Sequence, residues 1–198
     1  MPETSHRGGR HRHVPPELLS IWATAQRPGP SQRRGRYLPE SVKHPARMLP
    51  AIAAHAIARY TRPGDLVLDP MCGIGTTLVE AAWAGRDGIG VEYESRWADV
   101  ADANVSHARD QGAPGRASVV RGDSTRLTGL LPAALHGQVA LVVTSPPYGP
   151  TTHGLVEPGA NGVAKHDNSY GEADDDRGNL AHRDHTGLLD GFTQILRG

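Results

Sequence analysis

The sequence predicts an α/β domain over residues 37–198 with a parallel sheet of about four strands, and three observations lead to this expectation. Short apolar runs alternate along this part of the chain with longer stretches that have helical periodicity. A turn that contains two glycines separates the first apolar run from the helical stretch after it. Acidic residues follow three successive apolar runs, and the carboxyl ends of parallel strands meet at one edge of such a sheet.

The first expected elements are a helix, a strand and a second helix. The helix over 46–60 ends shortly before Pro63-Gly64-Asp65, which is a turn signal. The apolar run that follows this turn predicts a strand over 66–70. A loop with two glycines then leads into a helix over 76–84.

The remaining elements continue the alternation. Apolar runs predict strands over 88–93 and 118–122, with a helix over 95–110 between them. A further apolar run predicts a buried strand over 140–145. Apolar residues at helical spacing predict a last helix over 187–197.

The glycine loop has the features of a ligand-binding turn. Gly73 and Gly75 allow the backbone to approach a ligand closely, and the next helix begins with unpaired N–H groups that attract a carboxylate or a phosphate. A dinucleotide fingerprint would have a third glycine where Leu78 stands, which argues against NAD and FAD. No Gly-Lys-Ser/Thr follows, so a P-loop is absent.

Three acids at strand ends predict a nucleoside site. Glu92 lies about twenty residues after the glycine loop, a spacing at which an acid meets ribose hydroxyls. Asp123 follows the next strand and can accept from an adenine amino group, and Asp69 follows the first strand. Each acid alone is also explained as a helix N-cap or a solvated turn residue. Their recurrence at successive strand ends favours the nucleoside site.

The segment Thr144-Ser145-Pro146-Pro147-Tyr148 follows the last apolar run. Two prolines fix φ and remove two backbone donors, so their carbonyls stay free. An exocyclic amine on a flat ring can donate to Ser145 and to the carbonyl of Pro146, while the ring stacks on Tyr148. Alone, the segment also reads as a strand that ends in a proline turn.

Two segments together, Asp69-Pro70-Met71-Cys72-Gly73-Ile74-Gly75-Thr76-Thr77 and Thr144-Ser145-Pro146-Pro147-Tyr148, resemble the S-adenosylmethionine-dependent amino-methyltransferases of DNA. These methylate cytosine N4 or adenine N6, and their target motif is Asp/Asn/Ser-Pro-Pro-Tyr/Phe/Trp. His44-Pro45-Ala46-Arg47-Met48 resembles the segment that closes the methionine end of their site. The resemblance covers roughly residues 37–198 and implies a Rossmann-like sheet.

The resemblance also implies a role for each matching residue. The glycines pass the methionine moiety, with Asp69 and Thr76 near its amino and carboxylate groups, while Glu92 holds the ribose and Asp123 contacts the adenine. The cofactor S-adenosylmethionine is expected to be bound by His44, Pro45, Asp69, Pro70, Met71, Gly73, Gly75, Thr76, Thr77, Glu92 and Asp123. The catalytic residues are expected to be Ser145, Pro146, Pro147 and Tyr148, with no metal.

The resemblance implies a DNA target in a restriction–modification setting. The serine at 145 favours cytosine N4 over adenine N6, because the serine form of the motif is commonest among the cytosine-N4 enzymes of this family. Methylation at cytosine C5 needs a cysteine nucleophile and is disfavoured, because Cys72, the one cysteine, lies in the cofactor loop and not in a Pro-Cys setting. One alternative is an RNA enzyme similar to the tRNA guanine-N2 methyltransferases. Another is an inactive cofactor-binding fragment, because the family's sheet has further strands after a helix like 187–197 and the chain is expected to be truncated there.

Composition gives the remaining expectations. Formal net charge is +0, but residues 1–36 are rich in arginine, glycine and proline, which predicts a flexible basic arm that either touches phosphates or is merely solvated. Trp22 and Tyr37 are candidates to dock on the domain. The segment from 149 to 185 is rich in glycine, aspartate and histidine and is expected to form a loop over the bound base, without a tight metal-ligand pattern. One cysteine and no long apolar run favour a cytoplasmic protein.

Overall fold

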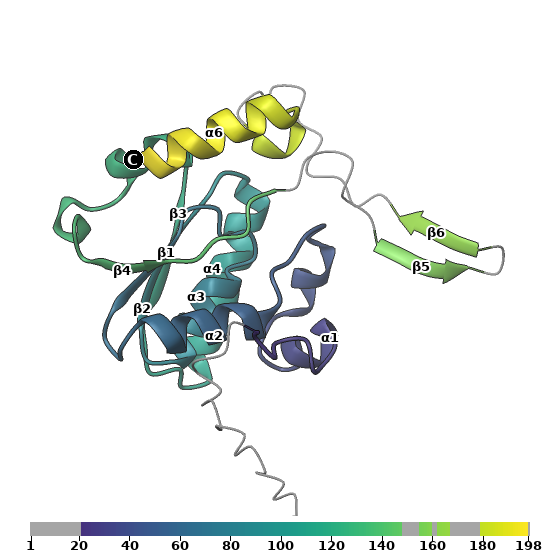
Figure 1. Ribbon diagram of the computed structural model, residues 1–198. Coiled ribbons are helices and arrows are strands. Elements are labelled where there is room, and N and C mark those ends of the chain that lie inside the picture. Colours follow the sequence, from purple (N-terminus) through teal and green to yellow (C-terminus); the bar gives the residue numbers. More distant parts are fainter. Residues whose placement is uncertain (1–20, 148–154, 160–161, 167–178, 198) are drawn as a thin grey trace, which may run out of the picture.

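The computed structural model describes residues 21–147, 155–159, 162–166 and 179–197, and Tyr148 of the predicted target motif lies outside these ranges (Figure 1). Its centre is a four-stranded parallel sheet in the order β3-β2-β1-β4. The strands of this sheet are β1 (Leu66–Asp69), β2 (Asp87–Glu92), β3 (Ala117–Arg121) and β4 (Val139–Val142). The predicted α/β class with a Rossmann-like parallel sheet is therefore confirmed for the part of the chain that the structure describes.

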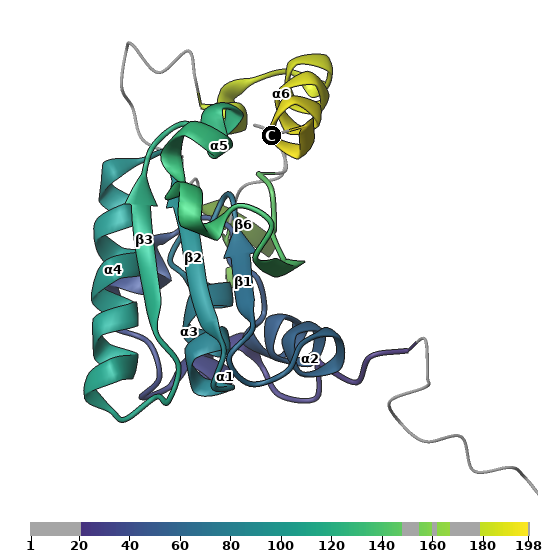
Figure 2. The same ribbon diagram turned by 90° about the vertical axis from the view of Figure 1, so that its left-hand side faces the viewer.

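Helices connect the strands and pack mainly on one face of the sheet. The α-helices are α1 (Gly29–Arg33), α2 (Pro50–Tyr60), α3 (Thr76–Trp83), α4 (Ser95–Asp110), α5 (Leu127–Leu130) and α6 (His185–Arg197). Short 3-10 turns are η2 (Pro39–Lys43), η3 (Ser124–Arg126), η4 (Ala133–Leu135) and η5 (Leu180–His182). Figure 2 shows α4 alongside β3 and α3 behind the sheet, and both helices contact β2 and β3. No helix within the described ranges is long and apolar enough to cross a membrane.

The core fills the layer between the sheet and these helices. Leu78 of α3 packs with Ala101 and Val105 of α4, next to the side chain of Cys72. A second cluster, formed by Ala53 and Ile57 of α2, Val67 of β1 and Ala81 of α3, joins α2 to β1. Because α3 begins directly after the glycine loop, the burial of its apolar side chains fixes that loop at the carboxyl end of β1.

Several predicted boundaries shift. The helix expected over 46–60 is α2, which begins at Pro50 and not at residue 46. Proline suits the first turn of a helix and disfavours helical geometry in the residue before it. The last strand ends at Val142 and not at 145, where two prolines that lack N–H groups follow shortly. The segment from 149 to 185, expected as a loop, contains the antiparallel strands β5 (Leu155–Gly159) and β6 (Gly162–His166).

The last part of the predicted basic arm packs on the domain. Arg36 donates to both carboxylate oxygens of Glu80 on α3, at 2.9 and 2.7 Å, and stacks on the Trp83 ring. The hydroxyl of Tyr37 donates to the same carboxylate at 2.7 Å. Trp22 lies with its ring centre 4.5 Å from that of His55 on α2. The docking expected of Trp22 and Tyr37 is therefore present.

We expect Glu80→Gln to lower the free energy of unfolding by about 1–3 kcal/mol, because the buried Glu80 carboxylate accepts three hydrogen bonds and an amide cannot accept all of them. Urea denaturation followed by circular dichroism measures this difference. Glu40→Gln, at an exposed position of η2, is the matched control and should leave stability almost unchanged. Equal stability of the two variants would mean that the Arg36–Glu80–Tyr37 network contributes nothing.

Candidate nucleoside-binding site at the carboxyl edge of the sheet

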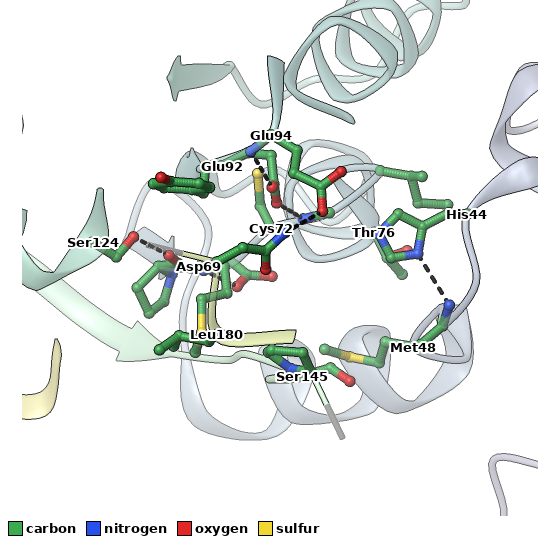
Figure 3. A pocket seen from close by; sticks show the side chains of 18 of the residues that line it. His44, Met48, Asp69, Cys72, Thr76, Glu92, Glu94, Ser124, Ser145 and Leu180 are labelled. Carbon is green, nitrogen blue, oxygen red and sulfur yellow. Dashed lines mark hydrogen bonds between the residues drawn. The ribbon is translucent and has the colours of Figure 1, made fainter. Parts of the chain in front are cut away.

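A pocket that is partly open to solvent lies at the carboxyl ends of the strands. Figure 3 shows it from close by, and α6 lies above the same sheet edge in Figure 1. Asp69, Glu92, Asp123 and Ser145, which follow or end the four strands, all line it. The strand ends thus converge as the sequence predicts.

The glycine loop requires glycine at both predicted positions. Gly73 and Gly75 have φ values of +52° and +79°, a region that residues with a Cβ rarely adopt. A Cβ at Gly73 would lie 3.1 Å from His44 Nε2, and one at Gly75 would lie 3.2 Å from the Ala101 Cβ. The first glycine lets His44 close over the loop, and the second lets α4 pack against it.

Asn104 holds this loop in place, although the sequence gives no sign of it. Its side chain is fully buried on α4, where its amide nitrogen donates to the Ile74 carbonyl and to the Ser41 hydroxyl, each at 2.9 Å. Its oxygen accepts from the Leu38 amide at 2.8 Å. One side chain therefore joins α4, the glycine loop and the segment before α2. All its hydrogen-bonding groups are paired inside the protein, as expected for a buried amide.

Asp69 lies at the base of the pocket with 2% of its surface exposed. One carboxylate oxygen accepts from the Met71 amide at 3.1 Å. Burial raises the pKa of Asp69 to about 6, and hydrogen bonding to the Thr77 and Thr144 side chains and to the Met71 amide opposes this rise only in part. A buried carboxylate of this kind is stabilised by a cationic ligand.

Glu92 ties β2 to the glycine loop. Its carboxylate accepts from the Gly73 amide at 2.8 Å and, with the other oxygen, from the Glu94 amide at 2.9 Å. Burial raises the pKa of Glu92 to about 7, and the charges of Glu94 and Asp69 add to the effect. A carboxylate has about four lone-pair sites, so acceptor capacity remains for the hydroxyls of a ligand in the pocket.

Asp123 acts as an N-cap, the alternative that the sequence leaves open for it. One of its oxygens accepts from the Thr125 amide at 2.9 Å and from the Thr125 hydroxyl at 2.8 Å, at the start of η3. The neighbouring Ser124 hydroxyl donates to the Pro70 carbonyl. Asp123 also lines the pocket, so the capping contact and a ligand contact are compatible.

The target motif lies on the β4 side of the same pocket. The Val143 amide donates to the Leu68 carbonyl at 3.0 Å, and the Thr77 hydroxyl donates to the Val143 carbonyl at 3.2 Å. These bonds hold the end of β4 beside β1 and the start of α3. Figure 3 shows Ser145 and Met48 along one side of the pocket and Glu92 and Glu94 across from them.

Most of the predicted site residues line this pocket. Those that do are His44, Asp69, Pro70, Met71, Gly73, Thr76, Glu92, Asp123, Ser145 and Pro147. Pro45, Gly75, Thr77 and Pro146 are not among the lining residues. For Gly75 and Thr77 the reason is visible, because the first packs against α4 and the second is bonded to the Val143 carbonyl. Both therefore support the site from behind.

The other lining residues are not individually predicted from the sequence, although three of them belong to the segment that resembles the one closing the methionine end. They are Ala46, Arg47, Met48, Cys72, Ile74, Tyr93, Glu94, Ser124, Thr125, Asn179, Leu180 and Ile195. Asn179 donates to the Glu94 carboxylate at 2.8 Å, which joins the segment before α6 to the end of β2. This pairing spans eighty-five positions in the chain, and no local pattern signals it.

A family model described as DNA methylase, of the N6/N4 methyltransferase kind, matches residues 3–103. This match covers half of the chain and includes the segment before α2, the glycine loop, the strand that ends at Glu92 and most of α4. The family model thus describes the part of the chain that forms the predicted cofactor side of the pocket.

Two curated proteins are similar to parts of the chain. The type II methyltransferase M.MthZI of Methanothermobacter thermautotrophicus is 40% identical over 55 residues, which are 28% of this chain and 16% of that protein. The tRNA (guanine(10)-N2)-dimethyltransferase of Methanocaldococcus jannaschii is 33% identical over 112 residues, which are 55% of this chain and 31% of that protein. The chain thus spans less than a third of the length of either relative.

Among solved structures, a candidate DNA modification methylase from Thermus thermophilus, complexed with S-adenosyl-L-methionine, is 32% identical to this chain. The similarity covers 49% of this chain and 44% of the other, with a TM-score of 0.32.

Proposed function

The chain belongs to the DNA methylase family, and on that premise we propose that it transfers a methyl group from S-adenosylmethionine to the exocyclic amine of a base in DNA, with cytosine N4 as the preferred target. One observation carries the proposal. The serine of the Ser-Pro-Pro motif and the acids that end β1 and β2 line one pocket, so an amine-binding segment and a nucleoside-binding edge face the same space.

S-adenosylmethionine is the cofactor of this family, and the pocket fits it. Its sulfonium and ammonium groups are cationic, and the Asp69 and Glu92 carboxylates, whose pKa values are raised by desolvation, would be stabilised by such charges. The glycine loop leaves room for a chain to pass at Gly73, and Glu92 keeps lone pairs for ribose hydroxyls. When bound, the cofactor supplies an electrophilic methyl carbon.

The protein's own contribution is to position the accepting amine. The lone pair of this nitrogen is delocalised into the base ring, so the amine is a weak nucleophile. Hydrogen bonds from its N–H groups to the Ser145 hydroxyl and the Pro146 carbonyl would favour a tetrahedral nitrogen and direct its lone pair into the pocket. Positioning and fixed dipoles of this kind supply most of the rate enhancement. The base has to be unpaired or flipped out of a duplex to reach this pocket.

A second candidate is an RNA enzyme that acts on guanine N2. It is favoured by the tRNA dimethyltransferase of Methanocaldococcus jannaschii, which is similar over 55% of this chain. The serine at 145 supports the DNA enzyme with cytosine N4 as its target.

An assay of the reaction separates these candidates. The 198-residue chain is incubated with labelled S-adenosylmethionine and either DNA or tRNA, and the product is digested to nucleosides. Label in N4-methyldeoxycytidine supports the proposal, label in N6-methyldeoxyadenosine corrects the base, and label only in tRNA guanosine overturns the DNA assignment. Cofactor binding in a calorimeter without transfer to either substrate would support a binding fragment that has no activity.

Ser145→Ala tests the amine contact. We expect kcat to fall by up to about tenfold, the value of one hydrogen bond, with an unchanged affinity for the cofactor. Steady-state transfer to DNA and calorimetric titration with the cofactor measure the two quantities. Ser118→Ala, at an exposed position of β3, is the matched control and should retain full activity. A weaker cofactor affinity with normal kcat would remove Ser145 from the amine site.

A further inference from the structure

The charged lining of the pocket is acidic with one exception. Four carboxylates line it, from Asp69, Glu92, Glu94 and Asp123. Among the lining residues that the structure describes, Arg47 is the one arginine or lysine. Any ligand that carries a carboxylate of its own has to keep that group away from the four acids, and Arg47 marks the place in the lining that would attract it.

Arg47 has hydrogen-bonding capacity to spare. One terminal nitrogen donates to the Ser41 carbonyl at 2.9 Å, which fixes the guanidinium relative to η2. The side chain is half-buried, and burial lowers its pKa. No ion pair to Arg47 is present among the residues that the structure describes. A guanidinium has five N–H donors in a planar fork, so it can still bind a carboxylate with two parallel hydrogen bonds.

A second arginine increases the positive potential beside Arg47. Arg33 of α1 donates to the Met48 carbonyl, one residue along the chain from Arg47. Its Nε is buried and has no hydrogen-bond partner among the residues that the structure describes. Burial lowers the pKa of Arg33, and the nearby charge of Arg47 lowers it further. Two half-buried cations therefore lie close together, and an anion at Arg47 would stabilise both of them.

The segment that carries Arg47 lies at the end of the pocket formed by β1 and β4. Met48 packs against the core cluster that contains Val67 of β1, and Leu141 of β4 packs against the same cluster. On the other side of Arg47, the His44 ring lies against Gly73 of the glycine loop. In Figure 3, His44 and Met48 lie on the opposite side of the pocket from Ser124, which follows β3.

We propose that Arg47 binds the α-carboxylate of the methionine moiety of S-adenosylmethionine. The inference rests on the proposed function, in which an acid that ends the second strand holds the ribose. The nucleoside then occupies the β2 and β3 end, so the methionine moiety extends past the glycine loop toward β1 and β4. There Asp69 meets the ammonium group and Arg47 meets the carboxylate, so the two charges of the amino acid are each paired with a side chain of opposite charge.

Calorimetry with two ligands tests this contact on the full 198-residue chain. S-adenosylmethionine and decarboxylated S-adenosylmethionine differ by the carboxylate that Arg47 is proposed to bind. The quantity to compare is the ratio of the affinity for the intact cofactor to the affinity for the decarboxylated form. We expect this ratio to be about tenfold to a hundredfold larger in the wild type than in Arg47→Met, which is the value of charge-assisted hydrogen bonds. Arg47→Lys should restore part of this preference, and Arg62→Met, which changes an exposed arginine, should match the wild type.

Each outcome has a separate meaning. The same ratio of affinities in wild type and Arg47→Met overturns the carboxylate contact and leaves the proposed function intact. If neither ligand binds to the wild type, the proposed function itself is overturned. Circular dichroism checks that Arg47→Met is folded, and Arg47→Gln gives a second variant without the charge. Weaker binding of DNA by Arg47→Met, with an unchanged preference between the two cofactors, would assign Arg47 to a phosphate and overturn the inference.

Discussion

Asp69→Asn is expected to weaken the binding of S-adenosylmethionine by more than about a hundredfold while raising the stability of the ligand-free protein. Asp69 is 2% exposed and lines the pocket where the proposed ammonium and sulfonium groups would lie. Removing one partner of a buried ion pair costs about 3–5 kcal/mol, because the other charge stays buried and uncompensated. The cationic ligand would therefore lose most of its affinity.

The same substitution should stabilise the protein when no ligand is present. Burial raises the pKa of Asp69 from 3.8 to about 6, so ionising it near neutral pH costs the folded state free energy. Asparagine removes that charge and keeps an oxygen for the Met71 amide. We expect a higher melting temperature at about pH 8, where the native carboxyl is ionised.

Calorimetric titration and thermal unfolding measure the two effects. Asp102→Asn, at an exposed position of α4, is the control and should change neither quantity. Unchanged cofactor affinity in Asp69→Asn would remove Asp69 from the site. A loss of both affinity and stability would contradict the prediction, because the lower affinity would then follow from damage to the fold and not from a lost contact with the ligand.

The parts of the site that the sequence predicts are those that depend on the chain direction of parallel strands. Asp69, Glu92 and Asp123 each follow or end an apolar run, and parallel pairing brings them to one edge whatever the details of packing. The glycine loop is predictable for a similar reason. Positive φ values at Gly73 and Gly75 are a local requirement that only glycine meets without strain.

The parts that the sequence does not predict depend on contacts between distant segments. Asn104 reads as a polar residue on a helix, and only the structure shows it buried between the glycine loop and η2. Arg36 reads as part of a basic arm, but Glu80 and Trp83 of α3 bind it. In both cases the partner is more than twenty-five positions away, and residue type alone does not reveal the pairing.

The stability of the ligand-free protein is expected to fall as the pH rises from about 4.5 to about 8. In the unfolded chain, aspartate and glutamate lose their protons near pH 3.9 and 4.3, roughly. In the folded protein Asp69 holds its proton to about pH 6 and Glu92 to about pH 7, because burial raises both pKa values. The folded state thus binds more protons within this window, so rising pH favours the unfolded state and the loss is complete above the folded pKa values.

The expected loss is large because the two carboxyls act in the same direction. One unit between the ordinary and the raised pKa corresponds to about 1.4 kcal/mol, which gives about 3 kcal/mol for Asp69 and about 3.5 kcal/mol for Glu92. Urea denaturation at several pH values measures the slope. Glu92→Gln should flatten the upper part of the curve, between about pH 5 and 7, and Asp69→Asn the lower part. A stability that rises over this window would contradict the burial of both charges.

The free energy that the folded protein loses when Asp69 and Glu92 ionise also affects which ligand the pocket binds. Desolvation of Asp69 and Glu92 makes the ligand-free state less stable near neutral pH, where both ionise, and a cationic ligand beside them recovers part of that free energy on binding. The affinity for S-adenosylmethionine should therefore increase as the pH rises from about 5 to 7, because less free energy is spent on removing protons. Glu92→Gln should show a weaker increase than the wild type, since its amide has no proton to release. The acids at the strand ends would then make the pocket selective for a cationic nucleoside, in addition to accepting its hydrogen bonds.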